Sequence, residues 1–440
     1  MRWRTVWAVG LLALLCLAWS GVDQIMMAQP QPAALTVAQQ EKDLRTLAAM
    51  LETHPLFLQQ PGRRPAFAAL VRRTVREAAY PLPSWRFMLL ADRLVHWFHD
   101  PHTYILFDTG HVPYGIVPLA FYWTTDGLVA VRVPGSPPTV ATGDRVLSLS
   151  GVPAQVIGQR MESLVAGNPY WVHSAPMTEQ MSLGPVLHGL GVVRKGGQVV
   201  VSLESKDGRR FSVPLQLNPW SLSGLAGLHN GIDGFLERYL GPRIRGLVGG
   251  PDWSWVVTPR YAYFRLASCV DNISYERAVQ RFFEQVAAQG ARDVVLDVSE
   301  NTGGDFTVMD AWLAHLPAPY AQADDRQVDR QSPEFNGRLY VLQSSTTFSS
   351  AMLLDAALTG PGRGIRVGEP VGEATAGWGS AGCQPLPESG ICAAVSGSYV
   401  QVLPGPVLPM LRPAIPLGLS VADVQRGIDP VARWLHRLGH

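Results

Sequence analysis

Lysine is almost absent from this chain of 440 residues, which contains only Lys42, Lys195 and Lys206. No lysine follows Lys206, so a lysine base is excluded from any catalytic site built by the second half of the chain. Long runs of like charge are absent as well, and the formal net charge is +1 at pH 7. No nucleic acid or acidic polymer is expected as a partner, because binding either one needs a strongly basic surface.

Cysteine is also scarce, with four residues in the chain. Cys383 and Cys392 flank a turn rich in proline and glycine, which could bring their Cα atoms within bridging distance in an oxidising compartment. Cys269 would then be the odd thiol, and we expect it in the core. A zinc site is not expected, because no second pair of cysteines or histidines has suitable spacing.

The chain begins with the pattern of a signal peptide, which we assign to residues 1–20. Arg2 and Arg4 precede an apolar stretch at residues 6–19 that is too short to span a membrane comfortably. Small residues around Ser20 suit cleavage by signal peptidase. We therefore expect a secreted or periplasmic, extracytoplasmic protein. The alternative is an uncleaved segment, which would be its only contact with a membrane.

Length and composition predict more than one domain, since 47% of the residues are hydrophobic and can form several cores. The β-rich part resembles a PDZ domain, because a Gly-Asp pair opens one of its strands, and residues 168–191 would be an insertion in it. The expected parts are a helical N-terminal domain at 35–104, the β-rich domain at 105–217, a connection at 218–252 and an α/β core at 253–440.

A strand-turn-helix pattern organises the core. Residues 339–342 form an apolar run typical of a buried strand, a Ser/Thr cluster follows, and a helical pattern then runs to Gly360. Ser349 and Ser350 fall in the first turn of this helix, where unpaired N–H groups and the helix dipole would stabilise an oxyanion. Ser349 is therefore a candidate nucleophile. The alternative is that these serines only cap the helix.

A second loop is expected at the same edge of the sheet. Strands at residues 261–266 and 293–298, with a helix between them, predict a parallel pair joined by a right-handed crossover. Gly303 and Gly304 follow the second strand at its C-terminal end, where open α/β sheets place their sites. Glycines there would let backbone N–H groups approach a reacting carbonyl, although a tight turn is an equal alternative.

Three histidines lie close together in the sequence, His96, His99 and His102. Pro101 should end the helix that carries the first two, so His102 lies beyond it on an extended segment. This break and the absence of an HExxH pattern argue against a metal site, and neither a metal nor another cofactor is expected. By itself, His102 would be read as a structural histidine.

In their order and spacing, the motifs resemble those of the S41 peptidases, the tail-specific or C-terminal processing family. The resemblance covers nearly all of the chain after the signal segment. It implies an α/β multi-domain fold with an N-terminal helical cap, a PDZ-like middle domain and an S41 protease-like core. The motifs are DPHT at 100–103, LDxxxNxGG at 296–304, TxSSA at 347–351 and VGEP at 367–370.

The resemblance also implies roles for individual residues. The nucleophile falls on Ser349, and the oxyanion donors fall on the backbone of Ser350 and of Gly303 or Gly304. One branch of the family uses a lysine base, but no lysine stands in that place here. The other branch uses the histidine of the DPHT motif, which places the general base on His102.

The acid that would orient His102 is the weak point of the match. The branch with a histidine base places a glutamate before a late segment whose counterpart here, at residues 411–414, has no acid. Glu369, Glu373 and Asp423 are the candidates, and we favour Glu369 because it follows the strand after the nucleophile helix. The alternative is that Glu369 is a structural carboxylate.

These observations predict an exported serine endopeptidase that acts on peptides or proteins through Ser349 and His102, without a cofactor. The main alternative is a catalytically inactive protein of the same fold that binds a peptide or a hydrophobic ligand, and the missing acid favours it. A peptide-binding module that uses only the PDZ-like part would leave the agreement of the separated motifs unexplained. The sequence predicts neither the cleavage specificity nor the oligomeric state.

Overall fold

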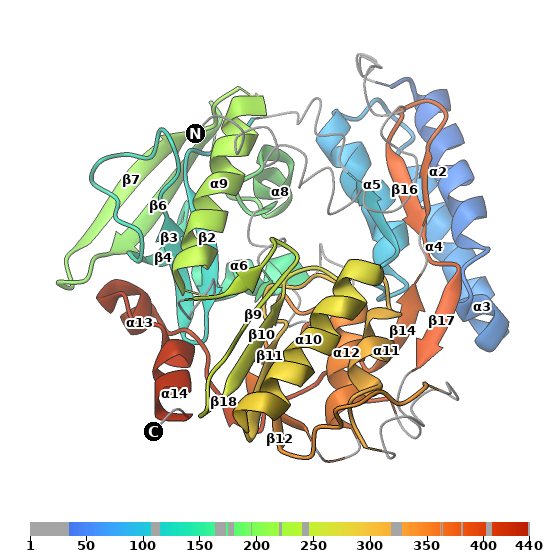
Figure 1. Cartoon of the computed structure of the whole chain (residues 1–440). Helices are drawn as coiled ribbons and strands as arrows, with labels where there is room; N and C mark the ends of the chain where they lie inside the picture. Colours follow the sequence, from blue (N-terminus) through green and yellow to red (C-terminus); the bar gives the residue numbers. More distant parts are fainter. Residues whose placement is uncertain are drawn as a thin grey trace.

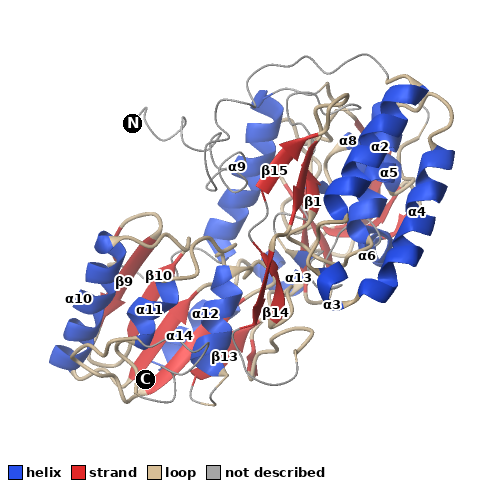
Figure 2. Ribbon diagram, turned by 90° about the vertical axis from the view of Figure 1, so that its right-hand side faces the viewer, coloured by secondary structure: helices blue, strands red, loops and turns tan. Residues whose placement is uncertain are grey.

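The computed structural model describes residues 35–438 except 107–114, 163–172, 175–179, 195, 220–221, 240–245, 318–327, 361, 363, 380–381 and 402–406. The predicted signal peptide lies outside the described residues. Within them, no helix is both long and apolar enough to cross a membrane. The described elements form a mixed α/β fold, as predicted (Figures 1 and 2).

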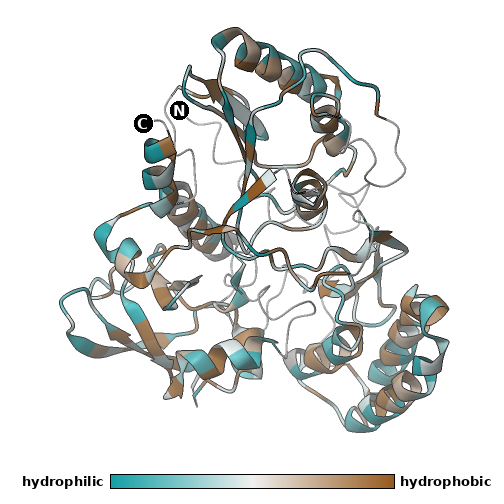
Figure 3. Cartoon of the chain, turned by 90° about the horizontal axis from the view of Figure 1, so that it is seen from below, coloured by the Kyte–Doolittle hydropathy of each residue, from teal (hydrophilic) through white to brown (hydrophobic). Residues whose placement is uncertain are grey.

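Helices form the first described region. Thr36 starts the first of them with a capping box, in which its hydroxyl accepts the N–H of Gln39 and the Gln39 side chain accepts the N–H of Thr36. Leu44, Phe67 and Leu94 are buried where the helices meet. Figure 3 shows hydrophobic and hydrophilic stretches side by side along several helices of the chain. The helices are α2 (Val37–Leu51), α3 (Leu56–Gln59), α4 (Arg64–Glu77) and α5 (Ser84–His96).

An antiparallel sheet follows, with helices on both of its faces. Phe121 and Ile157 are buried together with two short helices on one face, and Tyr122 and Phe235 are buried with α9 on the other. The name PDZ-like remains a prediction for this region. The strands, in sheet order, are β2 (Ala120–Thr124), β3 (Gly127–Val131), β4 (Arg145–Leu149), β6 (Gln198–Glu204) and β7 (Arg210–Gln216); the helices are α6 (Ala154–Glu162), α8 (Gly184–Gly189) and α9 (Leu222–Tyr239).

Helix α9 lies in the stretch that the sequence predicts as a connection. Its glycines suggested a loop, but two of them serve close packing instead. A Cβ atom at Gly231 would lie 2.6 Å from a methyl group of Val133, and one at Gly227 would lie 3.3 Å from the ring of Pro134. These two glycines therefore reflect the approach of the helix to the segment that follows β3.

The third region is a seven-stranded sheet with helices on both faces. Its neighbouring strands β10, β11, β12, β13 and β18 are parallel, which confirms the predicted parallel pair. In sheet order the strands are β18 (Ile415–Pro416), β13 (Gly364–Gly368), β12 (Arg338–Gln343), β11 (Asp293–Asp297), β10 (Ala262–Leu266), β9 (Trp253–Val257) and β8 (Val248–Gly249). The helices that pack on it are α10 (Ile273–Gln289), α11 (Val308–Leu313), α12 (Ser350–Thr359) and α14 (Pro430–Leu438), whereas α13 (Val421–Arg426) packs against the antiparallel sheet.

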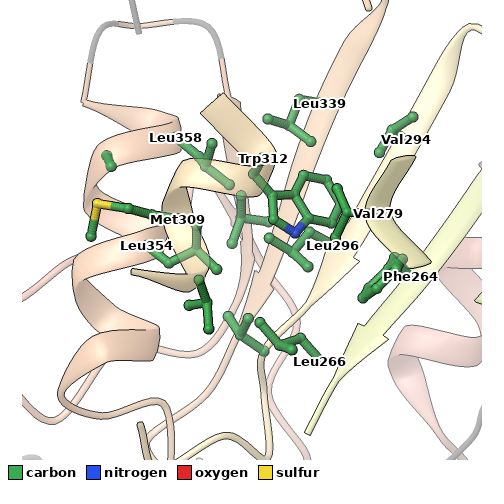
Figure 4. Close-up of a cluster of buried hydrophobic side chains, with 14 of the residues drawn as sticks. Phe264, Leu266, Val279, Val294, Leu296, Met309, Trp312, Leu339, Leu354 and Leu358 are labelled. Atoms are coloured by element: carbon green, nitrogen blue, oxygen red, sulfur yellow. The ribbon is translucent and has the colours of Figure 1, made fainter. Parts of the chain in front are cut away.

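Trp312 of α11 is central to the core beneath α12. The side chain is fully buried and meets Phe264 of β10 at right angles, with ring centroids 5.4 Å apart. Figure 4 shows it among Leu296 and Leu339 of the sheet and Leu358 of α12. Large apolar side chains thus fix α12, and with it the turn that precedes it, on the sheet.

Small sheets connect the N-terminal helices to the C-terminal region. Strand β1 (Tyr104–Leu106) pairs with β16 (Cys392–Val395), which pairs with β15 (Gly382–Pro385), and β14 (Ala376–Gly379) pairs with β17 (Ser398–Gln401). Figure 1 shows β16 beside the N-terminal helices, and Ala393 of β16 belongs to their core. Cys383 and Cys392 form the expected disulfide, with Cα atoms 5.7 Å apart, and Cys269 is free and buried.

Candidate active site

Ser349 lies at the turn between β12 and α12. Its backbone has φ of 53° and ψ of −126°, a combination that residues other than glycine rarely adopt. Thr347 holds the turn, because its hydroxyl donates to the Val298 carbonyl (2.9 Å) and accepts the N–H of Ser344 (2.9 Å). Among the described residues, the Ser349 side chain makes no capping hydrogen bond. Ser349 is half-buried, and its hydroxyl does not cap the helix.

The Asn-Thr-Gly-Gly loop packs directly against this turn. Gly303 has φ of 105°, and a Cβ atom there would lie 2.6 Å from the Cβ of Ser349 and 3.1 Å from the nitrogen of Ser350. Only glycine fits without displacing the serine. The Ser350 hydroxyl donates to the Gly304 carbonyl (2.7 Å), so the structure joins the two loops that follow neighbouring parallel strands.

Two backbone N–H groups at this junction are available to an oxyanion. The Gly303 N–H is already used, since it donates to the side-chain oxygen of Asn301 (2.8 Å). Within the described part of the chain, the N–H groups of Gly304 and Ser350 have no acceptor. Ser350 also opens α12, whose N-terminal dipole favours negative charge. Of the two glycines that the sequence left open, the geometry favours Gly304.

His102 lies between the end of α5 and strand β1. Its ring stacks on that of Phe348, the neighbour of Ser349, with centroids 4.6 Å apart. Burial lowers the pKa of His102, although the charge of Asp100 raises it. Neither ring nitrogen has a hydrogen-bond partner among the described residues. A neutral imidazole with an unused lone pair is therefore held beside the serine turn.

Glu373 connects the histidine to the serine. Its Oε2 accepts the backbone N–H of Ser349 (2.6 Å), and its Oε1 lies 3.5 Å from Nδ1 of His102. Burial raises the pKa of Glu373 to about 8; the Ser349 N–H lowers it, and the charge of Asp100 raises it further. The sequence named Glu373 among three candidates for the orienting acid but did not prefer it. Asp423, another of them, caps the start of α13.

Glu369, the candidate favoured from the sequence, lies elsewhere. Its carboxylate accepts the N–H of Leu419 (3.2 Å), and its backbone N–H donates to the Gln343 carbonyl (3.1 Å). Glu369 thus links the end of β13 to the segment that precedes α13. This contact fits the alternative role, that of a structural carboxylate. The assignment of Glu369 is therefore corrected: the chain turns after β13 and reaches His102 only at Glu373.

A buried network behind His102 was not found in the sequence. The Asp100 carboxylate accepts the backbone N–H of His102 (3.0 Å) and lies 3.1 Å from Nε2 of His54. It also accepts the hydroxyls of Thr103 (2.6 Å) and Ser396 (2.7 Å). Burial raises the pKa of Asp100, but the hydrogen bonds and His102 together outweigh it, so the pKa lies below its usual value. A lone histidine after a helix, as His54 is, carries no sequence signal.

The other two histidines of the predicted cluster have no place in this arrangement. The rings of His96 and His99 meet edge to face with centroids 5.5 Å apart. Burial and the neighbouring His99 lower the pKa of His96. Over the described ranges, no group of three or more His, Cys, Asp or Glu residues is placed to hold a metal ion.

Comparisons with known proteins give the site its context. Residues 260–396 match the model of peptidase family S41. This range contains Ser349, both loop glycines and Glu373, but not His102. No curated protein matches the chain significantly.

Solved structures extend the likeness beyond the matched range. Mature CPAF in complex with lactacystin is similar with a TM-score of 0.64 and 13% identity, covering 92% of this chain and 99% of that one. Mature CPAF alone gives a TM-score of 0.62 and 12% identity, covering 92% of this chain and 96% of that one. At this identity the likeness shows a shared fold. Residues 260–396 are thus similar to peptidase family S41, and nearly the whole chain shares the fold of these solved structures.

Proposed function

We propose that the protein is an exported serine peptidase that hydrolyses peptide bonds with Ser349 as nucleophile and His102 as general base. The observation that carries this proposal is the strained Ser349 turn, held between the Gly303 backbone and the carboxyl group that contacts His102. The match of residues 260–396 to a peptidase family model supports the reaction class. Export rests on the N-terminal sequence alone.

Each residue then has a defined task. His102 takes the proton of the Ser349 hydroxyl as its oxygen attacks the substrate carbonyl carbon, and later gives that proton to the leaving amine. The N–H groups of Ser350 and Gly304 stabilise the negative oxygen of the intermediate. Water then hydrolyses the acyl-enzyme by the same route. This mechanism requires neither a metal ion nor a cofactor.

Glu373 determines when His102 can act. Its Oε1 faces Nδ1 of the ring, so Nε2 is the nitrogen left to act as the base. Nδ1 must then carry the proton and donate it to an ionised carboxylate. If Glu373 is protonated, its own O–H faces Nδ1 and the ring proton moves to Nε2, where it blocks the base. We therefore assign Glu373 as the orienting acid, active in its ionised form.

The inactive, ligand-binding alternative loses its main ground. It rested on the lack of an acid at residues 411–414, where this branch of the family has one. Glu373 supplies a carboxyl group to His102 from a different loop. Peptides and proteins are accordingly the proposed partners, as substrates.

Labelling with a serine-reactive phosphonate tests the proposal without knowledge of the substrate. We expect the wild type to be labelled on Ser349 and Ser349→Ala to remain unlabelled. Ser345→Ala is a matched control, because this serine lies in the same turn and its hydroxyl donates to the His173 carbonyl (3.1 Å); it should still be labelled. A wild type that neither cleaves peptides nor reacts with the phosphonate would overturn the proposal.

A further inference from the structure

We propose that His54, from the N-terminal helices, positions the catalytic histidine through Asp100, so that the working site depends on a hydrogen bond made outside the α/β core. The inference rests on the proposed function and adds to it a residue that neither contacts the substrate nor reacts. Two buried groups carry it, and each has its partners defined by the structure.

Asp100 is the acceptor in this arrangement. Its Oδ1 takes the backbone N–H of His102, two residues further on, and so fixes the turn that carries the imidazole. The same oxygen lies 3.9 Å from Nδ1 of His102. That distance is too long for a hydrogen bond, but a charge there stabilises the imidazolium that forms when His102 takes the serine proton. Asp100 therefore has to be both ionised and fixed in place.

His54 is the donor that satisfies both needs. Its Nδ1 accepts the N–H of Leu56 (3.0 Å), so the ring proton must sit on Nε2, which lies 3.1 Å from Oδ2 of Asp100. The ring is fully buried and packs against Phe98 and Trp378, with centroids 4.5 and 5.0 Å away. This position therefore requires a flat side chain that accepts a hydrogen bond at one edge, donates one at the other edge and packs its faces against apolar rings.

The same carboxylate also joins distant parts of the chain. Oδ2 accepts the hydroxyls of Thr103, just before β1, and of Ser396, just after β16. The Ser396 N–H in turn donates to the Thr103 hydroxyl (3.0 Å). His54 therefore acts on a carboxylate that already joins the loop carrying His102 to the C-terminal region, which also contains Ser349.

Two variants of His54 separate positioning from packing. His54→Phe keeps the ring but removes the donor to Asp100, whereas His54→Gln can place an amide N–H near the site of Nε2. Both lose the acceptor of the Leu56 N–H, and His54→Gln also loses the ring that contacts Phe98 and Trp378. A higher activity in His54→Gln than in His54→Phe would therefore report the donor. His315→Phe is the matched control, since His315 is also buried and stacked, on Phe283 (4.6 Å), in the core of the α/β region.

The readouts are kcat and KM, measured above pH 8 where Glu373 is ionised, and urea unfolding below pH 5. We expect kcat of His54→Phe to fall about 10- to 100-fold with KM little changed, and His54→Gln to recover much of the loss. Losing a donor raises the pKa of Asp100, so the loss of stability in acid should begin at a higher pH in His54→Phe and not in His54→Gln. The other titratable groups facing this carboxylate, His102 and Glu373, are common to both variants. His315→Phe should behave as wild type.

Folding is checked first, by thermal unfolding. If His54→Phe does not fold, Ser396→Ala, which removes another donor to Oδ2, should show a smaller loss in kcat and an acid loss of stability that also begins at a higher pH. Equal losses of kcat in folded His54→Phe and His54→Gln, or an unchanged acid unfolding profile in folded His54→Phe or Ser396→Ala, would overturn the inference. A wild type without Ser349-dependent labelling would instead overturn the proposed function, so the two failures are distinguishable.

Discussion

Two buried carboxyl groups lie beside the ring of His102, and burial affects them very differently. Asp100 accepts hydrogen bonds from His54, the His102 backbone and two hydroxyls, and its pKa is lowered. Glu373 accepts one described hydrogen bond, from the Ser349 N–H, and its pKa is raised to about 8. The surroundings therefore favour the ionised form of Asp100 and the protonated form of Glu373.

Because both groups are buried, the difference in their pKa values follows from the hydrogen-bond donors and neighbouring charges around each carboxyl group. It also separates two tasks between the two sides of the ring. In the proposed mechanism, Asp100 supplies a negative charge from the N-terminal side, and Glu373 supplies a group that must lose its proton before His102 can serve as a base. Changes to the reacting groups and to each acid test this contrast.

Removing the reacting groups should have the largest effect, since both carboxyl groups act through His102. Ser349→Ala and His102→Ala should each lower kcat/KM for a peptide substrate by several orders of magnitude. The double variant should lose little more, because nucleophile and base act as one unit. His99→Ala, three residues before the base, is the control and should cost far less. Full activity in Ser349→Ala would place the reaction elsewhere.

Replacing the acid by its amide should have the next largest effect. In Glu373→Gln the amide oxygen can still accept the Ser349 N–H, but the amide N–H group then faces Nδ1 of His102 and leaves the ring proton on Nε2. We expect kcat to fall by about 10²- to 10⁴-fold. Glu369→Gln is the matched change at a buried glutamate that pairs with Leu419, and kcat should stay close to wild type. Equal losses in the two variants would contradict the assignment.

The contrast between Glu369 and Glu373 also shows what could not be predicted from the sequence. Local pattern was sufficient to predict the strand-turn-helix at Ser349 and the parallel pair β10 and β11, because apolar periodicity and turn residues are local signals. The motif that contains His102 was recognisable from its neighbours. Which glutamate reaches His102 depends on how the chain turns after β13, and nothing in the local pattern encodes that path.

His54 and helix α9 escaped prediction for related reasons. The partner of His54 is 46 residues further along the chain, and a buried donor-acceptor histidine has no periodic signal. The glycines of α9 suggested a connection, but Gly231 serves close packing against Val133. In both cases a tertiary contact gives the residue its role, so only the folded chain reveals it.

Stability should respond to pH more weakly, and with a sign set by each carboxyl group. The pKa of Glu373 is raised from 4.5 to about 8, so its contribution is fully present below about pH 4.5 and is lost as the pH rises through 8. We expect the free energy of unfolding to fall over this range, by up to about 1.4 kcal/mol per pH unit. Urea unfolding at a series of pH values should show a flatter profile for Glu373→Gln. An identical profile would mean that Glu373 does not titrate in this range.

Asp100 should have the opposite and smaller effect, seen only in acid. Its pKa is lowered, so its contribution is present above the ordinary value of about 3.9 and is lost as the pH falls through the folded pKa. His54→Gln, which keeps a donor to Asp100, should show this acid loss, and His54→Phe should show it at a higher pH. Urea unfolding below pH 5 measures the difference. Coincident curves would show that His54 does not set the charge of Asp100.

The most direct test of the site is the pH dependence of phosphonate labelling on Ser349, measured in the wild type and in Glu373→Gln. An isolated imidazole would give a rate that rises around pH 6–7. Because the working state needs Glu373 ionised, we predict a rise centred near pH 8 in the wild type, and slow labelling without that rise in Glu373→Gln. A wild-type midpoint at pH 6–7 that is unchanged in Glu373→Gln would contradict the role of Glu373 beside His102.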